Sequence, residues 1–132
     1  MKTALLALGL AGMIGCLESC NPFAPDQSVQ LGASKLDAPQ TITSGSSLNV
    51  VVTVQLGGCL SFDRIVTERT TTNATLTVLG TDAAKGRKNV SCATYIFYEP
   101  HTVRLDPPFS NPFTITANNG RLPPLTATVQ VQ

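Results

Sequence analysis

Apolar and polar residues alternate with a period of two along much of the chain. The clearest run is 48–56, where every second residue is Leu or Val. The same alternation recurs at 74–78, 113–118 and 125–131. A period of two places the apolar side chains on one face of a β-strand, because successive side chains point to opposite faces. Helical periodicity is missing beyond the first residues, so the pattern predicts an all-β protein.

Residues that favour turns separate these runs. Gly57-Gly58, Lys85-Gly86 and Asn119-Gly120 are examples, and the last is typical of a two-residue hairpin turn. The strands are predicted near 39–44, 48–56, 60–70, 74–81, 93–98 with 102–106, 112–118 and 125–131. This gives seven strands, of which the fifth is either one bent strand or two.

Short strands that each carry one apolar face favour two antiparallel sheets packed face to face. The segments 58–62, 91–93, 103–105 and 112–120 resemble small immunoglobulin-like β-sandwich domains found on exported bacterial proteins. The resemblance covers residues 40–131 and lacks the buried Trp of antibody domains. It implies an Ig-like topology and says little about function.

The N-terminal residues have the layout of a secretory signal peptide. One positive charge at Lys2 is followed by twelve apolar or small residues, 4–15. A bilayer-spanning helix needs about 20 apolar residues, so this segment is too short to remain as a transmembrane anchor. We therefore predict a signal peptide at 1–15.

The sequence Gly12-Met13-Ile14-Gly15-Cys16 resembles the lipobox of bacterial lipoproteins, with Met13 where that family usually has Leu. The resemblance implies that the Cys16 thiol receives a diacylglycerol before the signal is cut. Two or three acyl chains on one residue give stable membrane anchoring. Cys20 is the alternative lipidation site, but the charged Glu18 precedes it where a small or apolar residue is expected. In another reading, Cys16 merely belongs to a cleavable signal and Cys20 is free or forms a disulfide.

The predicted organisation has three parts. Residues 1–15 are the signal peptide, and 16–34 are the lipidated N-terminus and a flexible tether, because Pro, Ser, Asn, Gln and Gly mix there without a structural period. Residues 35–132 form the domain.

Cys59 and Cys92 are the two cysteines within the predicted domain. Export places them in an oxidising compartment, so we expect them to form a disulfide between two strand ends. Closing a loop of about 33 residues stabilises a fold by roughly 3–4 kcal/mol in the chain-entropy model. A metal site is disfavoured because there is no Cys-x-x-Cys pair and His101 is the only His.

Composition and charge narrow the function classes. Charged residues make up 13% of the chain and the net charge is +1, which disfavours a nucleic-acid binder. His101, placed by the pattern in a turn, lacks a nucleophile motif beside it. The sequence therefore predicts no enzyme, no cofactor and no metal.

Two surface features have competing interpretations. The basic cluster 85–88 is either a solvated loop or a contact for anionic envelope polymers or lipid headgroups. Tyr95, Phe97 and Tyr98 either pack alternately into the core or form a stacking platform for a sugar or a peptide, and core packing is the favoured interpretation.

These observations predict a non-enzymatic, lipid-anchored protein of the bacterial cell envelope, on the periplasmic or surface side. Its Ig-like domain would act as a binding or structural module for a protein or envelope polymer, while the lipid contacts the membrane. The alternative is an exported protease inhibitor or accessory domain that presents the Pro-rich loops 106–112 and 121–124.

Overall fold

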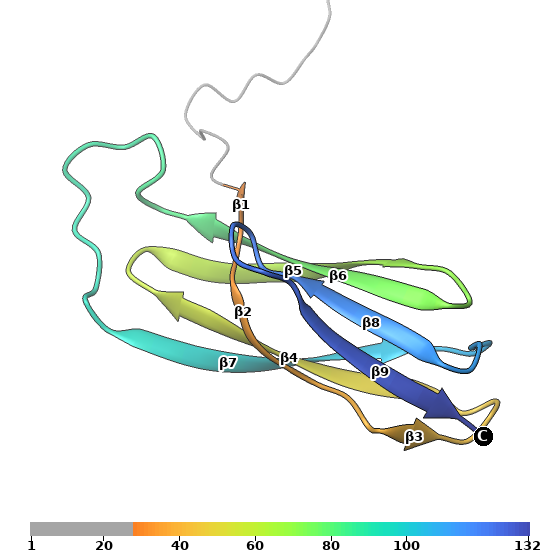
Figure 1. Cartoon of the computed structure of the whole chain (residues 1–132). Coiled ribbons are helices and arrows are strands. Elements are labelled where there is room, and N and C mark those ends of the chain that lie inside the picture. The colour runs from red at the N-terminus through yellow and green to blue at the C-terminus, as the bar shows by residue number, and fades with distance from the viewer. Residues whose placement is uncertain (1–27) are drawn as a thin grey trace, which may run out of the picture.

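The computed structural model describes residues 28–132, which form nine strands arranged in two layers (Figure 1). The predicted signal peptide 1–15 and both candidate lipidation sites, Cys16 and Cys20, lie outside the described residues. Within the described range no helix has the length and apolar character to cross a membrane.

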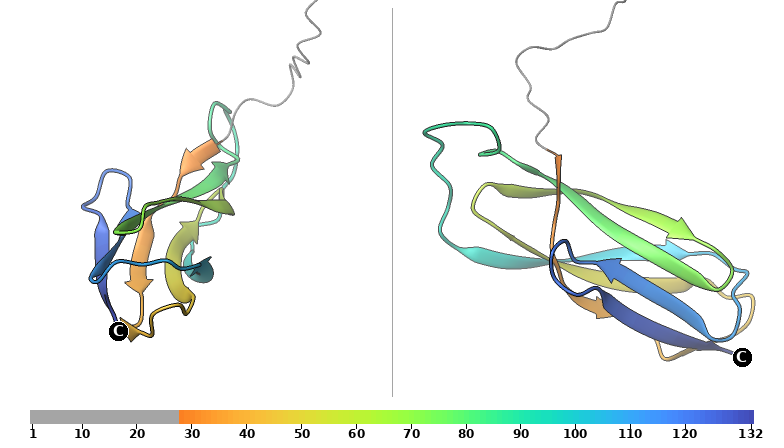
Figure 2. Two further views of the ribbon diagram at one scale, coloured as in Figure 1. Left: turned by 90° about the vertical axis from the view of Figure 1, so that its right-hand side faces the viewer. Right: turned by 45° about the horizontal axis from the view of Figure 1, so that its top comes forward.

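The strands are β1 (Ser28–Gln30), β2 (Ala33–Asp37), β3 (Thr41–Ile42), β4 (Leu48–Gly57), β5 (Leu60–Arg69), β6 (Asn73–Asp82), β7 (Ile96–Leu105), β8 (Phe113–Asn118) and β9 (Leu125–Val131). The smaller sheet has the order β2-β4-β7. The larger sheet has the order β1-β6-β8-β9-β3, and β5 pairs with the other edge of β6. Figure 2 shows the two layers from one end of the strands.

The core forms where the apolar faces of the two sheets meet. Each alternate apolar residue of β4, from Leu48 to Leu56, is at most 2% exposed. The larger sheet contributes the matching alternate residues of β6 and β8, including Leu76, Phe113 and Ile115, all at 0%. Buried residues in the described range are hydrophobic throughout. The alternation in the sequence therefore marks the core faces of these strands correctly.

The predictions of an all-β fold and of two sheets are confirmed, but the expectation of purely antiparallel pairing was wrong. β6 pairs with β8 in parallel, and β3 pairs with β9 in parallel. Parallel neighbours need a crossover connection. Between β6 and β8 the chain crosses to the smaller sheet, forms β7 and returns, so β8 runs in the same direction as β6.

The predicted fifth strand is one continuous strand, β7, although it contains Pro100. β7 pairs with β4 alone, so it is an edge strand. Pro100 lies opposite Thr53 of β4. Gln55, two residues beyond Thr53, donates its backbone N–H to the Gly32 carbonyl on the side of β2, so Thr53 also bonds toward β2 and not toward β7. Since hydrogen-bonding direction alternates along a strand, Pro100 faces the free edge, where its missing N–H leaves the ladder intact.

Residues 28–34, which were predicted to belong to the tether over 16–34, are part of the folded domain, while residues 16–27 lie outside the described residues. β1 pairs with Leu79–Thr81 of β6, and Ala33 at the start of β2 is buried. Strands of three and five residues are too short to show a readable alternation, and the chain moves from one sheet to the other between them. The predicted strand at 39–44 is reduced to the two residues of β3.

The chain crosses from the larger to the smaller sheet between β1 and β2, and Leu31, which is 2% exposed, anchors this crossing. Its backbone N–H donates to the Val78 carbonyl at 2.9 Å. Its side chain lies against Gly80, where a Cβ would collide with Leu31 Cδ1 and with the carbonyl oxygen of Ser61. A glycine at this position therefore allows the N-terminal strand and β5 to approach β6 together.

We predict that Gly80→Ala destabilises the domain by about 2 kcal/mol, because overpacking forces Leu31 or β5 to shift. The melting temperature, measured by circular dichroism, should fall by roughly 10 °C. Ser46→Ala, at an exposed loop position, is the control and should remain near wild type. A Gly80→Ala protein that melts like the wild type would contradict the proposed packing of Leu31.

Candidate functional site

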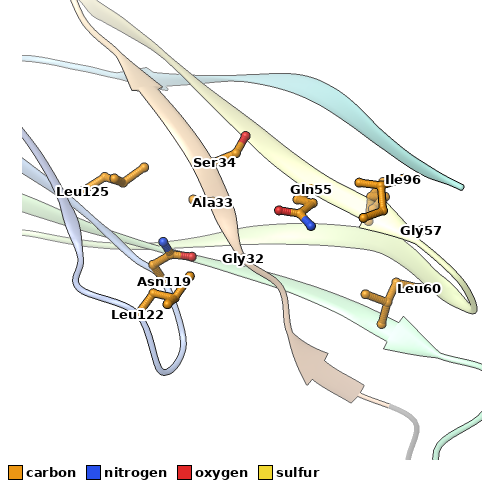
Figure 3. Close-up of a pocket in the computed structure, with 11 residues that line it drawn as sticks. Gly32, Ala33, Ser34, Gln55, Gly57, Leu60, Ile96, Asn119, Leu122 and Leu125 are labelled. Atoms are coloured by element: carbon orange, nitrogen blue, oxygen red, sulfur yellow. The ribbon is translucent and has the colours of Figure 1, made fainter.

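A pocket of about 570 Å³ opens where the end of β4 meets the connection between β8 and β9 (Figure 3). The pocket is lined by apolar residues from six segments: Ala33, Leu56, Leu60, Ile96, Leu122 and Leu125. Ser34, Gln55 and Asn119 add polar groups to the wall. An apolar pocket with a few polar groups is the usual form of a small-ligand or side-chain binding site.

Asn119 is the most informative of the polar groups. Its Oδ1 atom is buried and has no hydrogen-bond partner among the described residues. Ser34, by contrast, already donates its hydroxyl to the Thr53 carbonyl at 3.1 Å. A buried acceptor without a partner costs free energy. The Oδ1 atom of Asn119 is therefore ready to accept a hydrogen bond from a donor that enters the pocket.

The connection that carries Asn119 differs from the predicted two-residue hairpin. A type I′ turn needs positive φ at both central residues, whereas here Gly120 has φ +58° and Asn119 is outside that region. The backbone carbonyl of Asn119 instead accepts a hydrogen bond from the Leu122 N–H at 2.9 Å. β9 starts only at Leu125, because Pro123 and Pro124 have no N–H to donate to the sheet. The longer connection places Leu122 beside the pocket.

Two of the pocket residues, Ile96 and Leu122, are also exposed at the surface. The large hydrophobic residues that are exposed in the described range are Val66, Val90, Tyr95, Ile96, Phe97, Tyr98 and Leu122. All but Val66 belong to loop 83–95, the first three residues of β7 or the connection 119–124. We call these three segments together the apolar end of the domain.

The favoured interpretation of the aromatic stretch was wrong. Tyr95 and Tyr98 are 64% and 59% exposed, and Phe97 is 40% exposed although it lies opposite the buried Leu56. Leu105, at the other end of β7, is 3% exposed, so the same strand reaches the core at one end and leaves these side chains uncovered at the other. The Tyr95 and Phe97 rings lie 5.8 Å apart, between centroids, on the surface.

Cys59 and Cys92 form the predicted disulfide, with Cα atoms 5.0 Å apart. The bond joins the turn after β4 to loop 83–95, rather than two strand ends as expected. Gly57 allows the same close approach, since a Cβ there would lie 2.6 Å from the Tyr95 carbonyl oxygen. The disulfide thus fixes the loop that leads into the exposed aromatic stretch.

The same loop carries Lys85, Arg87 and Lys88 and contains no Asp or Glu. Lys85 Nζ donates to the Ser28 carbonyl at 2.7 Å, which fastens the loop to β1. The carboxylate of Asp82 accepts a hydrogen bond from the Ala84 N–H at 2.9 Å, where the loop begins. The basic cluster therefore lies beside the point at which the described chain starts.

His101 lies within β7 rather than in the predicted turn. Its ring stacks on Phe62 of β5, with ring centroids 3.6 Å apart, across the gap between the two sheets. The Nε2 atom is buried and has no partner among the described residues. Across residues 28–132, no three side chains of His, Cys, Asp or Glu come together as a group able to hold a metal.

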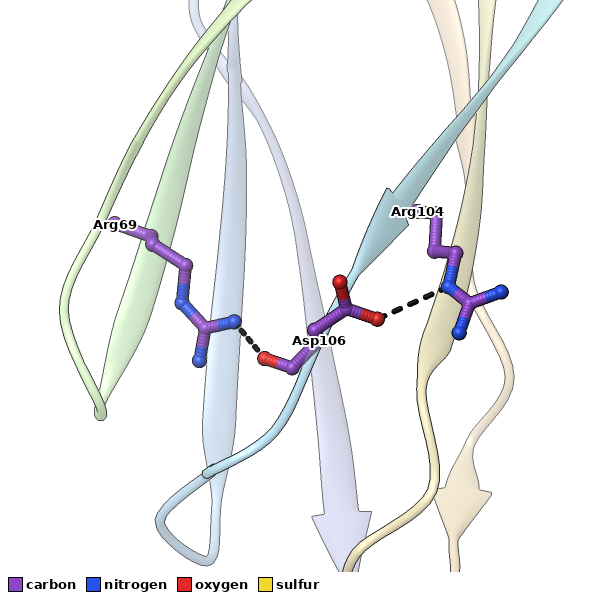
Figure 4. A network of polar contacts seen from close by, with 3 residues as sticks. All are labelled: Arg69, Arg104 and Asp106. Atoms are coloured by element: carbon purple, nitrogen blue, oxygen red, sulfur yellow. Dashed lines mark hydrogen bonds and ion pairs between the residues drawn. The ribbon is translucent and has the colours of Figure 1, made fainter.

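The Pro-rich loop 106–112 closes the opposite end of β7. The Arg69 guanidinium donates to the carbonyls of Asp106 and Pro108, the latter at 2.6 Å, while the Asp106 carboxylate pairs with Arg104 (Figure 4). Arg69 also lies 4.7 Å above the Phe109 ring, measured to the centroid. This loop is fastened to the domain, and sequence reasoning missed the role of Arg69 because its partners are 37 and 39 residues away.

The pocket residues were also missed. A signal existed in the run 95–98, because four consecutive large apolar residues break the period of two and cannot all face one core. No comparable signal marks Asn119 or Leu122, whose positions depend on how the β8–β9 connection folds.

Comparison of the chain with family models, with curated proteins and with solved structures finds no match. The structure itself defines the class: an all-β domain of two sheets, with a mixed larger sheet and an apolar pocket at its disulfide-bonded end.

Removing the disulfide should destabilise the domain. Reduction, or the double change Cys59→Ala with Cys92→Ala, is expected to cost about 3 kcal/mol and to lower the melting temperature by roughly 10–20 °C. The measurement is thermal unfolding with and without reductant, with the double variant as control because reductant should leave it unchanged. Free thiols at both Cys59 and Cys92, found by mass spectrometry in protein kept under oxidising conditions, would contradict this prediction.

Proposed function

We propose that this protein is a non-enzymatic, lipid-anchored component of the bacterial cell envelope, whose Ig-like domain binds a partner through its apolar end. The observation that carries the proposal is the exposure of apolar side chains at the apolar end, two of which, Ile96 and Leu122, line the pocket. Soluble domains rarely expose contiguous apolar surface without using it for an interaction. Tyr95, Ile96, Tyr98 and Leu122 are each at least 59% exposed.

The pocket supports a binding role for this surface. Ile96 and Leu122 belong both to the pocket wall and to the exposed surface. A partner on the surface therefore reaches the pocket directly, and the Asn119 acceptor supplies one directional contact inside it.

The anchoring part rests on the lipobox-like sequence that ends at Cys16. The Cys59–Cys92 disulfide supports export, since such bonds persist in oxidising compartments. Export and a lipid at Cys16 together place the domain at a membrane surface without a spanning segment.

The inhibitor alternative gains less support. The loop 106–112 that it requires is rigid, but Phe109 turns inward and packs edge-to-face on the buried Phe113, with centroids 4.8 Å apart. No residue of this loop is among the exposed large hydrophobic residues.

We predict that Cys16→Ala releases the protein from the detergent phase in a Triton X-114 partition or leaves it unprocessed, because the acyl chains can no longer be attached. Wild type should partition into detergent. Cys20→Ala is the matched control and should behave like wild type. The opposite pattern, with only Cys20→Ala released, would show that Cys20 carries the lipid.

We further predict that the apolar end binds the fluorescent probe 1-anilinonaphthalene-8-sulfonate and that Leu122→Asp lowers this signal several-fold. A carboxylate at the rim of the pocket opposes both apolar contact and the anionic probe. Val66→Asp changes an exposed apolar residue that lies on β5, away from the pocket, and should keep the wild-type signal. Equal losses in both variants would argue against a specific apolar site.

A further inference from the structure

We propose that the apolar end docks on an anionic phospholipid surface, namely the surface of the membrane that holds the lipid anchor. This inference rests on the proposed function and names the partner of the same surface. Three independent features of the structure support it: the chemistry of the exposed side chains, the charge around them, and the point at which the described chain begins.

The exposed side chains suit the boundary between lipid headgroups and acyl chains. Tyr95 and Tyr98 combine an apolar ring with a polar hydroxyl, the combination that favours membrane interfaces. Ile96 and Leu122, at 60% and 65% exposed, supply purely apolar groups of the kind that insert just below the headgroups.

The two loops that carry or adjoin these residues are positively charged. Lys85, Arg87 and Lys88 flank them in loop 83–95, and Arg121 lies next to Leu122. Neither loop 83–95 nor connection 119–124 contains an Asp or Glu. Basic groups beside an apolar surface attract it to anionic headgroups.

The other basic residues of the domain are engaged elsewhere. Lys35, Arg64 and Arg104 form ion pairs with nearby aspartates, and Arg69 holds the Pro-rich loop at the other end of β7. The net charge of the chain is only +1, so the four basic residues of loop 83–95 and connection 119–124 are a local feature of the apolar end.

The described chain begins at this same end. Ser28 lies beside loop 83–95, where Lys85 bonds its carbonyl (Figure 1). Eleven residues separate Cys16 from Ser28, and an extended chain spans at most about 3.5 Å per residue, so Ser28 stays within roughly 40 Å of a lipid at Cys16. Such a short connection keeps the apolar end at high effective concentration near the bilayer.

Strand addition along the free edge of β7 is the main competing use of this region. Pro100 sits in the middle of that edge and offers no N–H there, so a partner strand would lose a hydrogen bond at the centre of the ladder. A second copy of the chain meets the same obstacle, and two positive ends would also repel each other.

The test uses the processed, lipidated protein reconstituted in vesicles of phosphatidylglycerol and phosphatidylethanolamine. The chain contains no Trp, so a single Trp reports on one position. Tyr98→Trp places it in the apolar end, and Thr71→Trp places it in the exposed turn between β5 and β6, at the far end of the domain. Lipids brominated on their acyl chains should quench the Tyr98→Trp emission by about half and leave the Thr71→Trp emission nearly unchanged.

The electrostatic part is tested in the Tyr98→Trp background. Replacing Lys85, Arg87 and Lys88 with Gln, adding high salt, or using phosphatidylcholine vesicles should each reduce the quenching substantially, since surface attraction is screened and needs anionic lipid. Replacing Lys35 with Gln instead should leave the quenching unchanged. If the quenching does not change with salt or with lipid charge, the proposed preference for anionic lipid is wrong.

Mass spectrometry of the N-terminal peptide shows whether Cys16 carries the lipid, so membrane docking and lipid anchoring are tested separately. If Cys16 carries the lipid but the two Trp variants are quenched equally, or Tyr98→Trp not at all, docking is overturned while anchoring stands. If the lipid is absent and added anionic vesicles still quench Tyr98→Trp selectively and in a salt-dependent way, docking stands while anchoring fails. A blue-shifted Tyr98→Trp emission that brominated lipid does not quench would indicate a protein surface, and would also overturn the proposal.

Discussion

Burial of the apolar face of β4 is the constraint on which the rest of the domain depends. Its alternate Leu and Val residues are essentially inaccessible to water, and each such side chain contributes roughly 1.5–3 kcal/mol relative to an exposed one. A slip of one residue would turn this whole face toward solvent, so the register with β2 and β7 is fixed by the same burial. The larger sheet covers this face with β6 and β8, and the two-layer form follows from that contact.

The two ends of β7 then have opposite characters. At one end Arg69 donates to loop carbonyls and covers aromatic rings, so the Pro-rich loop becomes part of the closed domain. At the other end the strand enters the fold from loop 83–95, and its first residues have only β4 beside them. The disulfide and Gly57 hold that entry close to the turn after β4. The result is a rigid support under side chains that no part of the described domain covers.

Rigidity matters for the binding role proposed for this end. A surface held in place by a disulfide and by the contact between Lys85 and Ser28 loses little conformational freedom when it meets a partner. The pocket beside it is formed by segments that are far apart in sequence, from Ala33 to Leu125. Its shape is therefore a property of the complete fold rather than of any one loop.

The sequence by itself determined the strand class, the core faces of β4, β6, β8 and β9, and the pairing of Cys59 with Cys92. These features depend on local alternation, or on there being only two cysteines in the domain. Only the tertiary structure decided the parallel pairing of β6 with β8, the docking of β1 through Leu31, and the exposure of Tyr95 to Tyr98. Each depends on which strand lies beside another after the chain has crossed between sheets. Alternation shows which side chains share a face of a strand, but the opposing layer must lie over that face to bury it, and along β7 it does so at Leu105 and not at Tyr98.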